Sequence, residues 1–175
     1  METGMIVTTT ILIVICTVPF ILIIGSTKKK EKQIKNALKA GVAKNNGTLT
    51  DCSININFAL GLDSKAKQIY YYKKTPEVEF LQKINLNTVK TCEITKDTKR
   101  IRNGKSNYEK ICRVALLFTS KKGQVIEQFE LFNYDDSSQL SGELALADTW
   151  KKKVIDLLAT NLEEHKIQEA PLEFA

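Results

Sequence analysis

The chain has 175 residues, of which 26 are Lys or Arg and 20 are Asp or Glu, so its formal net charge is +6. This length suits one domain, and a content of 43% hydrophobic residues excludes disorder as the main description. Four cysteines without paired spacing exclude a disulfide-stapled mini-domain, and a single histidine removes most metal sites and acid–base constellations.

The N-terminal 27 residues contain a long uncharged run. No charged residue lies between Glu2 and Lys28, and the segment 5–24 is predominantly apolar. As a helix rising about 1.5 Å per residue, this segment spans the roughly 30 Å hydrocarbon layer of a bilayer. A cleaved secretory signal would need a basic region before the apolar run and a small-residue cleavage site after it, and both are missing. We therefore predict a retained transmembrane anchor over residues 1–27.

A basic segment follows the apolar run, and residues 28–47 are predicted to form a juxtamembrane helix and a linker. Gly41 and the Asn45-Asn46-Gly47 triplet are expected to break this helix. The positive-inside rule then places the C-terminal domain in the cytoplasm and the N-terminus outside. The lysines also predict non-specific attraction to anionic lipid headgroups, although fixing the topology alone would explain them. The predicted membrane-interface residues are Lys28, Lys29, Lys30, Lys32, Lys35 and Lys39.

The next segment, residues 48–162, is predicted to be one mainly β domain. Apolar residues alternate with polar ones from Ile54 to Leu60, which indicates a half-buried strand. A charged segment around the Asn103-Gly104 turn predicts a hairpin. Short polar turns separate the strands, so we expect about seven strands in an antiparallel meander. The further predicted strands are 68–72, 80–86, 89–95, 111–119 and 124–134.

The last predicted element is an amphipathic helix. Ser137 or Ser138 is expected to cap its N-terminus, and Trp150 lies near the middle of its apolar side. The helix is expected to end near Asn161, and residues 163–175 are predicted to be a flexible tail. The apolar residues that recur at helical spacing are Leu140, Leu144, Ala147, Val154 and Leu158.

Three segments resemble bacterial pleckstrin-homology-like (PH-like) domains: FALGLDSKAKQIYYY at 58–72, INLNTVKTCEI at 84–94 and ALADTWKKKVIDLL at 145–158. The resemblance implies a bent antiparallel barrel of about seven strands, capped at one end by a single helix. It also implies that Trp150 of that helix anchors it in the core. PH-like domains mostly bind lipids or proteins or act as scaffolds, so the resemblance implies a binding module.

Basic residues of two turns form a possible ligand or partner face. Lys65 and Lys67 resemble half of the lipid-binding pattern of PH-like domains, but the first half of that pattern is absent from residues 52–64. A solvated hairpin would also explain the charges of the second turn. Aromatic residues are not interleaved with these bases, so nucleic-acid binding is not expected. The proposed face consists of Lys65, Lys67, Lys96, Lys99, Arg100, Arg102 and Lys105.

No catalytic residue, cofactor or metal site is predicted. Gly104-Lys105-Ser106 lacks the preceding glycine of a phosphate-binding loop, and the cysteines lack the spacing of zinc ligands. We therefore expect a single-pass membrane-anchored PH-like binding module, acting as a non-catalytic accessory or scaffold subunit with a membrane-protein or other protein partner. The alternative is an assembly subunit whose transmembrane helix is the main interaction surface, with Thr8, Thr9 and Thr10 bonding a neighbouring helix.

Overall fold

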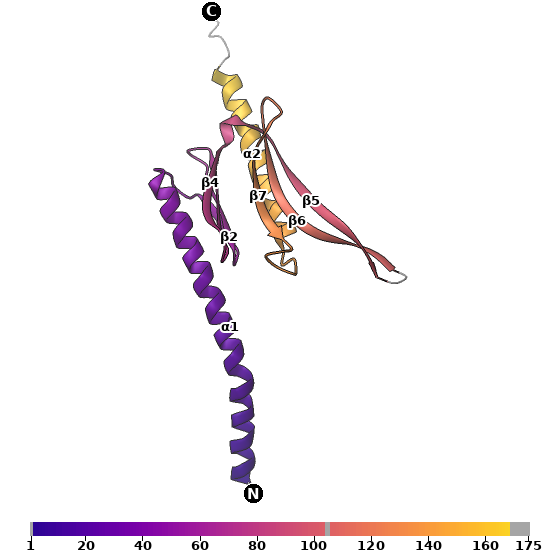
Figure 1. The fold of residues 1–175 in the computed structure, drawn as a ribbon. Coiled ribbons are helices and arrows are strands. Elements are labelled where there is room, and N and C mark those ends of the chain that lie inside the picture. The colour runs from indigo at the N-terminus through magenta and orange to yellow at the C-terminus, as the bar shows by residue number, and fades with distance from the viewer. Residues whose placement is uncertain (1, 104–105, 169–175) are drawn as a thin grey trace, which may run out of the picture.

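The computed structural model describes residues 2–103 and 106–168 of the chain (Figure 1). A long helix comes first, seven strands follow, and a second helix closes the described part. The elements in chain order are α1 (Glu2–Lys44), β1 (Asp51–Ile54), β2 (Phe58–Asp63), β3 (Gln68–Lys74), β4 (Glu79–Asn85), the short 3-10 helix η1 (Leu86–Thr88), β5 (Val89–Asn103), β6 (Ser106–Ser120), β7 (Val125–Asn133) and α2 (Glu143–Gln168).

The strands form two antiparallel sheets, followed by a C-terminal helix. Strands β1 to β4 form a four-stranded sheet, and strands β5 to β7 form a three-stranded sheet, each in sequence order. Every pairing joins strands that are consecutive in the chain. The predictions of a mainly β chain, of antiparallel pairing and of a C-terminal helix are therefore confirmed.

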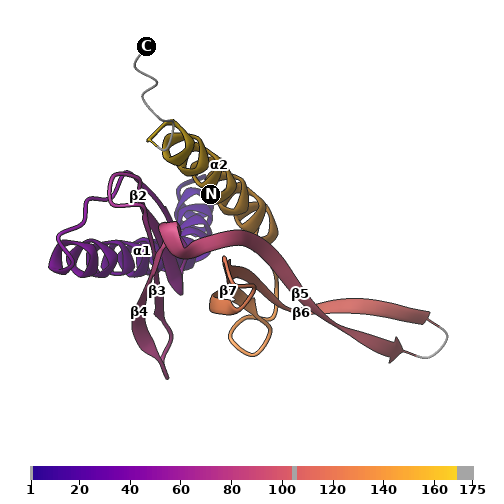
Figure 2. The same ribbon diagram turned by 90° about the horizontal axis from the view of Figure 1, so that it is seen from above.

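The main core lies between the two sheets and α2 (Figures 1 and 2). Tyr71 of the first sheet stacks on Phe129 of the second, with ring centroids 4.9 Å apart. Trp150 of α2 is fully buried in this core, and its indole N–H donates a hydrogen bond of 3.0 Å to the Ser53 hydroxyl of β1. One side chain of α2 therefore connects the helix to the first strand of the opposite sheet.

The C-terminal half of α1 covers the outer face of the four-stranded sheet. Its buried side chains recur at helical spacing as Ile34, Leu38 and Val42, and they form a second core with residues of β2 and β3. The sheet residues buried in this core are Ala59, Tyr70 and Tyr72. Part of the segment expected to be a juxtamembrane helix and linker is therefore packed as an integral layer of the domain.

The prediction that Gly41 breaks the first helix is wrong, because α1 continues through it to Lys44. A Cβ atom at this position would lie 2.5 Å from Cδ2 of Leu81 in β4, so the glycine allows the helix to lie close to the sheet. The helix ends at the Asn45-Asn46-Gly47 turn instead, where Asn46 adopts a positive φ of 54° and the Gly47 amide bonds to the Val42 carbonyl.

The N-terminal half of α1 extends beyond the two sheets (Figure 1). Its described apolar side chains are exposed, from 65% for Ile6 to 45% for Val18. Among the described residues, no helix is at once long enough and apolar enough to span a membrane.

The expected single strand from Ile54 to Leu60 is wrong, because a tight turn divides it into β1 and β2. The Asn55 amide bonds to the Phe58 carbonyl at 2.8 Å, and the Asn55 side chain accepts a bond from the Ile56 amide. Asparagine stabilises turns by bonding nearby backbone groups in this way, which explains why the alternation does not continue as one strand. Ile56 is therefore at a turn, and 43% of it is exposed.

Strands β5 and β6 are longer than expected, at 15 residues each. The predicted charged hairpin is the far end of these two strands, where Asn103 pairs with Ser106. Gly104 of the predicted Asn103-Gly104 turn lies outside the described residues.

The predicted ends of the second helix also differ from the structure, since α2 begins at Glu143 rather than after Ser137 or Ser138. The intervening loop is held to the end of β7, where the Ser137 amide bonds to the Asn133 carbonyl. The helix continues beyond Asn161 to Gln168, so the expected tail begins within the helix, and residues 169–175 lie outside the described part.

Asp63 joins the end of α1 to the β2–β3 turn and is expected to make the stability depend on pH. Burial raises its pKa, but hydrogen bonds from the amides of Ala66, Thr48 and Lys65, with the Lys65 charge, lower it more, so the net pKa is below the usual value.

Such a carboxylate stabilises the fold above its unfolded pKa of about 3.9, and the contribution is lost as the pH falls through the folded pKa. We expect Asp63→Asn to reduce the unfolding free energy at neutral pH and to flatten its decline below about pH 4. Urea denaturation over this pH range measures both effects. If the unfolding free energies of the wild type and of Asp63→Asn declined equally with falling pH, Asp63 would not be the source of the pH dependence.

Candidate functional site

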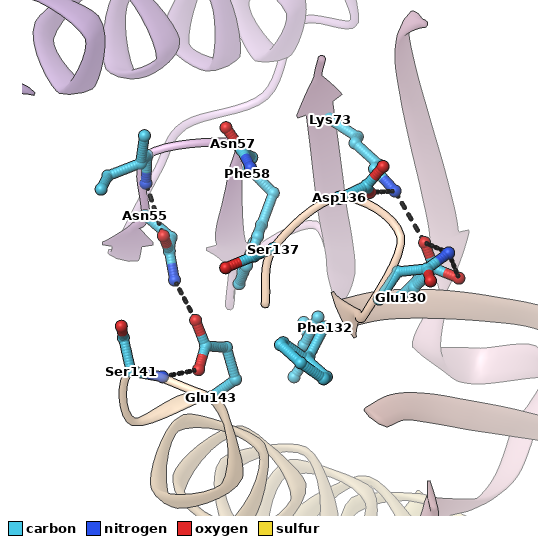
Figure 3. Close-up of a pocket in the computed structure, with 13 residues that line it drawn as sticks. Asn55, Asn57, Phe58, Lys73, Glu130, Phe132, Asp136, Ser137, Ser141 and Glu143 are labelled. Carbon is cyan, nitrogen blue, oxygen red and sulfur yellow. Dashed lines mark hydrogen bonds and ion pairs between the residues drawn. The ribbon is translucent and has the colours of Figure 1, made fainter. Parts of the chain in front are cut away.

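A polar pocket with a volume of about 170 Å³ lies at one end of the two sheets (Figure 3). The turn between β1 and β2, the end of β3, the end of β7 and the loop before α2 form its walls. Figure 3 shows two separate groups of polar side chains in this pocket, with Phe58 and Phe132 between them. The polar and charged side chains that line it are Asn55, Asn57, Lys73, Glu130, Asn133, Asp136, Ser137, Ser141 and Glu143.

The first polar group is a cluster of ion pairs around Lys73. Its ammonium lies 2.6 Å from Glu130 Oε1 and 2.8 Å from Asp136 Oδ2, and Arg113 Nε lies 2.8 Å from Glu130 Oε2. Burial lowers the pKa of Lys73, but the hydrogen bonds that its ammonium donates to Asp136 and Glu130 raise it more, so the net pKa is above the usual value. Lys73 is therefore cationic at neutral pH, and two carboxylates balance the two cations.

The second polar group is centred on Glu143 in the first turn of α2, where a carboxylate is favoured by the helix dipole. Glu143 is only 7% exposed, and its Oε1 accepts a 3.2 Å bond from the Asn55 side chain. Its other oxygen accepts a bond from the Ser141 amide. This carboxylate therefore connects the β1–β2 turn to the start of α2.

These contacts show a pocket whose charged groups hold a loop in place. The residues that line it include neither histidine nor cysteine. Burial raises the pKa of the Cys92 thiol, which lies in the main core, to about 12, so this cysteine is protonated and a poor nucleophile at neutral pH. Among the described residues, no group of three or more His, Cys, Asp or Glu side chains is placed to hold a metal ion. The charged side chains of the pocket are thus engaged in contacts that hold the loop before α2 in place.

A second hollow, of about 220 Å³, lies where α1 meets the tips of the four-stranded sheet. Lys30, Gln33 and Ile34 line it from the helix side. The turn after β1 and the turn after β3 line the other side, through residues 56–57 and 74–76. These turns therefore lie beside the basic part of α1.

The six predicted membrane-interface lysines all lie on α1, and all are exposed. Lys28, Lys29, Lys30 and Lys32 lie between the exposed apolar segment and Ile34, the first residue buried against the sheet, whereas Lys35 and Lys39 are exposed side chains of the segment packed on the sheet. The first four lysines therefore form a band between the apolar end of α1 and the domain.

The structure does not bring together the two parts of the predicted ligand face. The Leu86 amide bonds to the Lys67 carbonyl, so the turn that carries Lys65 and Lys67 lies beside the start of β5. Lys96 and Arg102 lie seven and thirteen residues further along β5 than Val89, about 23 and 43 Å along an extended strand. Lys99 and Arg100 are between them and exposed, and Lys105 lies outside the described residues.

The sequence alone does not indicate the pocket. The Asp135-Asp136 pair is typical of a turn, and an acidic residue such as Glu143 is typical of the N-terminal part of a helix, so neither pattern points to a pocket. The sequence does not indicate that Lys73 belongs to a pocket, because a lysine at the end of a strand is ordinarily solvated. The link between Lys73 and Glu130 joins residues 57 positions apart in the chain, and such a contact becomes visible only in the folded structure.

Comparison of the chain with protein-family models, with curated proteins and with solved structures finds no match.

Proposed function

We propose that the chain is a single-pass membrane protein in which the apolar part of α1 is the anchor and the β-rich domain is a non-catalytic PH-like binding module at the cytoplasmic face. The observation that carries this proposal is the apolar run of the sequence, which continues through residues 19–24, whose side chains are outside the described ones, and is therefore longer than the apolar stretch found among the described residues. In the sequence this run covers residues 5–24, and eight large apolar side chains between Ile6 and Val18 are at least 45% exposed. Apolar surface of this extent favours transfer out of water.

The threonines of the apolar run are compatible with a lipid environment. The hydroxyls of Thr8, Thr10 and Thr17 donate hydrogen bonds to backbone carbonyls four residues earlier, at 2.6, 2.8 and 2.9 Å. A hydroxyl bonded within its own helix does not need a partner from water or from another chain. These three residues therefore do not oppose burial of the helix in a membrane.

Packing of α1 on the sheet supports a fixed position of the module relative to the bilayer. Leu38 and Val42 are almost completely buried against the sheet, and the same helix continues to the apolar run without a break. A binding surface held in this way meets membrane-bound partners at a raised effective concentration. An accessory or scaffold role follows from this arrangement.

The PH-like assignment is supported by the order of the elements. Four strands of one sheet, three strands of a second and a final helix match the arrangement that the resemblance implies. Trp150 of that helix is buried in the core between the sheets. An α1 layer on the outer face of the first sheet is an addition to that arrangement.

The proposed orientation can be tested by labelling single introduced cysteines with a membrane-impermeant maleimide. Gly4→Cys and Lys122→Cys are suitable because both residues are exposed and lie near opposite ends of the molecule. We expect labelling above the wild-type level on intact cells for Gly4→Cys, and for Lys122→Cys only after permeabilisation. Labelling of Lys122→Cys on intact cells would overturn the cytoplasmic assignment.

The alternative role, in which the helix itself is the interaction surface, is favoured by the same exposed apolar side chains. Replacement of residues 1–27 by an unrelated membrane anchor separates the two roles. If the domain is the binding surface, affinity capture from native membranes recovers the same partner with either anchor. Loss of the partner with the replaced anchor would support the alternative.

A further inference from the structure

The β5–β6 hairpin projects from the body of the domain beyond Asp97 of β5, and we call this projecting part the arm. Residues 98–103 of β5 and 106–111 of β6 pair beyond a bulge, and Figures 1 and 2 show this end projecting past the sheets. Every residue from Lys96 to Arg100 is exposed, as are Arg102 and the residues from Asn107 to Glu109. The arm therefore presents its side chains outward, although its strands are as long as any in the fold.

One face of the arm combines basic and apolar groups. Lys99 is paired with Lys110, and Ile101 is paired with Tyr108, and directly opposite residues of adjacent strands share a face. Tyr108 is 49% exposed. The Lys110 ammonium lies 3.1 Å from the ring centroid of Tyr134, which is itself 38% exposed, so the face continues onto the end of β7. We name the surface formed by Lys99, Ile101, Tyr108 and Lys110 the arm face.

The opposite face of the arm has a different character. Arg100 lies 3.2 Å from Glu109, its cross-strand partner, and both side chains are exposed. Arg102 is paired with Asn107. This face is polar, and the charge of Arg100 is paired with that of Glu109. The apolar Ile101 and the aromatic Tyr108 lie on the arm face instead.

We infer that the arm face lies on the anionic surface of the same bilayer that holds α1. This inference rests on the proposed function. Figure 1 shows the arm extending obliquely, away from α1 but toward the side of the domain from which the apolar part of α1 emerges. A face with two lysines, an isoleucine and a tyrosine matches the chemistry of the interface, where tyrosine is enriched and lysines attract anionic headgroups.

The arm would give the domain a second membrane contact, to one side of α1. The band of lysines on α1 surrounds the point where the helix leaves the lipid, whereas the arm projects sideways from the sheets (Figure 2). Two separated contacts would fix the rotation of the domain about the axis of α1, which a single helix leaves free. The partner-binding surfaces would then be presented in one orientation.

The test uses the full chain reconstituted in vesicles of phosphatidylcholine, with or without phosphatidylglycerol, that contain a lipid brominated on the upper part of its acyl chains. Bromine quenches tryptophan fluorescence at short range, so Tyr108→Trp reports contact of the arm face with lipid, after subtraction of the Trp150 signal of the wild type. Val125→Trp is the matched control, because Val125 is 62% exposed at the start of β7, the end of the strand away from Tyr134.

We expect strong quenching of Tyr108→Trp in the anionic vesicles and little quenching of Val125→Trp. Each basic residue near an anionic surface contributes about five-fold to local association, so adding Lys99→Gln and Lys110→Gln, the two lysines of the arm face, is expected to weaken the contact about 25-fold. Adding Lys121→Gln and Lys122→Gln, exposed lysines of the β6–β7 turn, should leave it unchanged.

Two results separate failure of this inference from failure of the proposed function. If the full chain floats with the vesicles while Tyr108→Trp is quenched no more than Val125→Trp, the inference on the arm face is overturned, whereas the proposal that α1 is a membrane anchor still holds. If the full chain does not float with vesicles of either composition, the membrane anchor and the inference both fail.

Discussion

A chain that begins at residue 48 is expected to lose most of its folding free energy, whereas a chain that begins at residue 28 keeps it. The difference between them is the segment that contains Ile34, Leu38 and Val42, which are at most 2% exposed. Burial of each such side chain contributes about 1.5–3 kcal/mol, so the three together contribute about 4.5–9 kcal/mol. Since whole domains are stable by about 5–15 kcal/mol, this loss would leave the shorter chain marginally stable or unfolded.

Urea denaturation followed by circular dichroism measures this difference. Leu38→Ala in the chain that begins at residue 28 provides a milder version, with an expected loss of about 2–5 kcal/mol. Lys39→Ala is the matched control, because Lys39 is the exposed neighbour of Leu38. If the chain that begins at residue 48 unfolded at the same urea concentration as the longer chain, α1 would not be a layer of the domain.

The substitution Trp150→Ala is expected to destabilise the domain by about 3–5 kcal/mol, because it leaves a large cavity. Trp150 is fully buried and is the largest side chain of the main core. Ser53→Ala is expected to have a smaller effect, about 1–3 kcal/mol, because it removes only the acceptor of the indole N–H. In the double variant Ser53→Ala/Trp150→Ala the two losses should not add, since both remove one shared contact.

Thermal or urea unfolding of these variants gives the required free energies. Lys152→Ala is the control, because Lys152 is exposed on the same helix, and a change within about 0.5 kcal/mol is expected. A loss below about 1 kcal/mol for Trp150→Ala would show that α2 is not anchored by this side chain.

Much of the fold follows from local sequence patterns. Short polar turns on either side identified the strands around Tyr71 and Ile84, and helical spacing placed Trp150 on the apolar side of the last helix. The helical pattern is readable because α2 buries one side against the main core, whereas β2 and β3 are buried on both faces, between the main core and α1. The division of the first strand at Asn55 was missed, because Ile56 continues the alternation although it lies in a turn.

The role of α1 could not be predicted from its own sequence. Ile34 and Leu38 are four residues apart and so share one face of a helix, but the sequence does not indicate what covers that face. Gly41 usually indicates a break, and only its contact with Leu81 shows that it allows close packing. The pocket was equally hidden, because Lys73 and Glu130 come from different sheets.

We propose that α1 both anchors the chain in a membrane and forms a layer of the β domain. The most direct test compares the full chain with a chain that begins at residue 28, by flotation with vesicles after alkaline carbonate extraction at high salt. High salt weakens contacts that depend only on lysines, whereas a buried apolar helix is unaffected. We predict that the full chain floats with the vesicles and that the shorter chain is released as a folded protein. Release of the full chain by carbonate would show that α1 does not span the membrane.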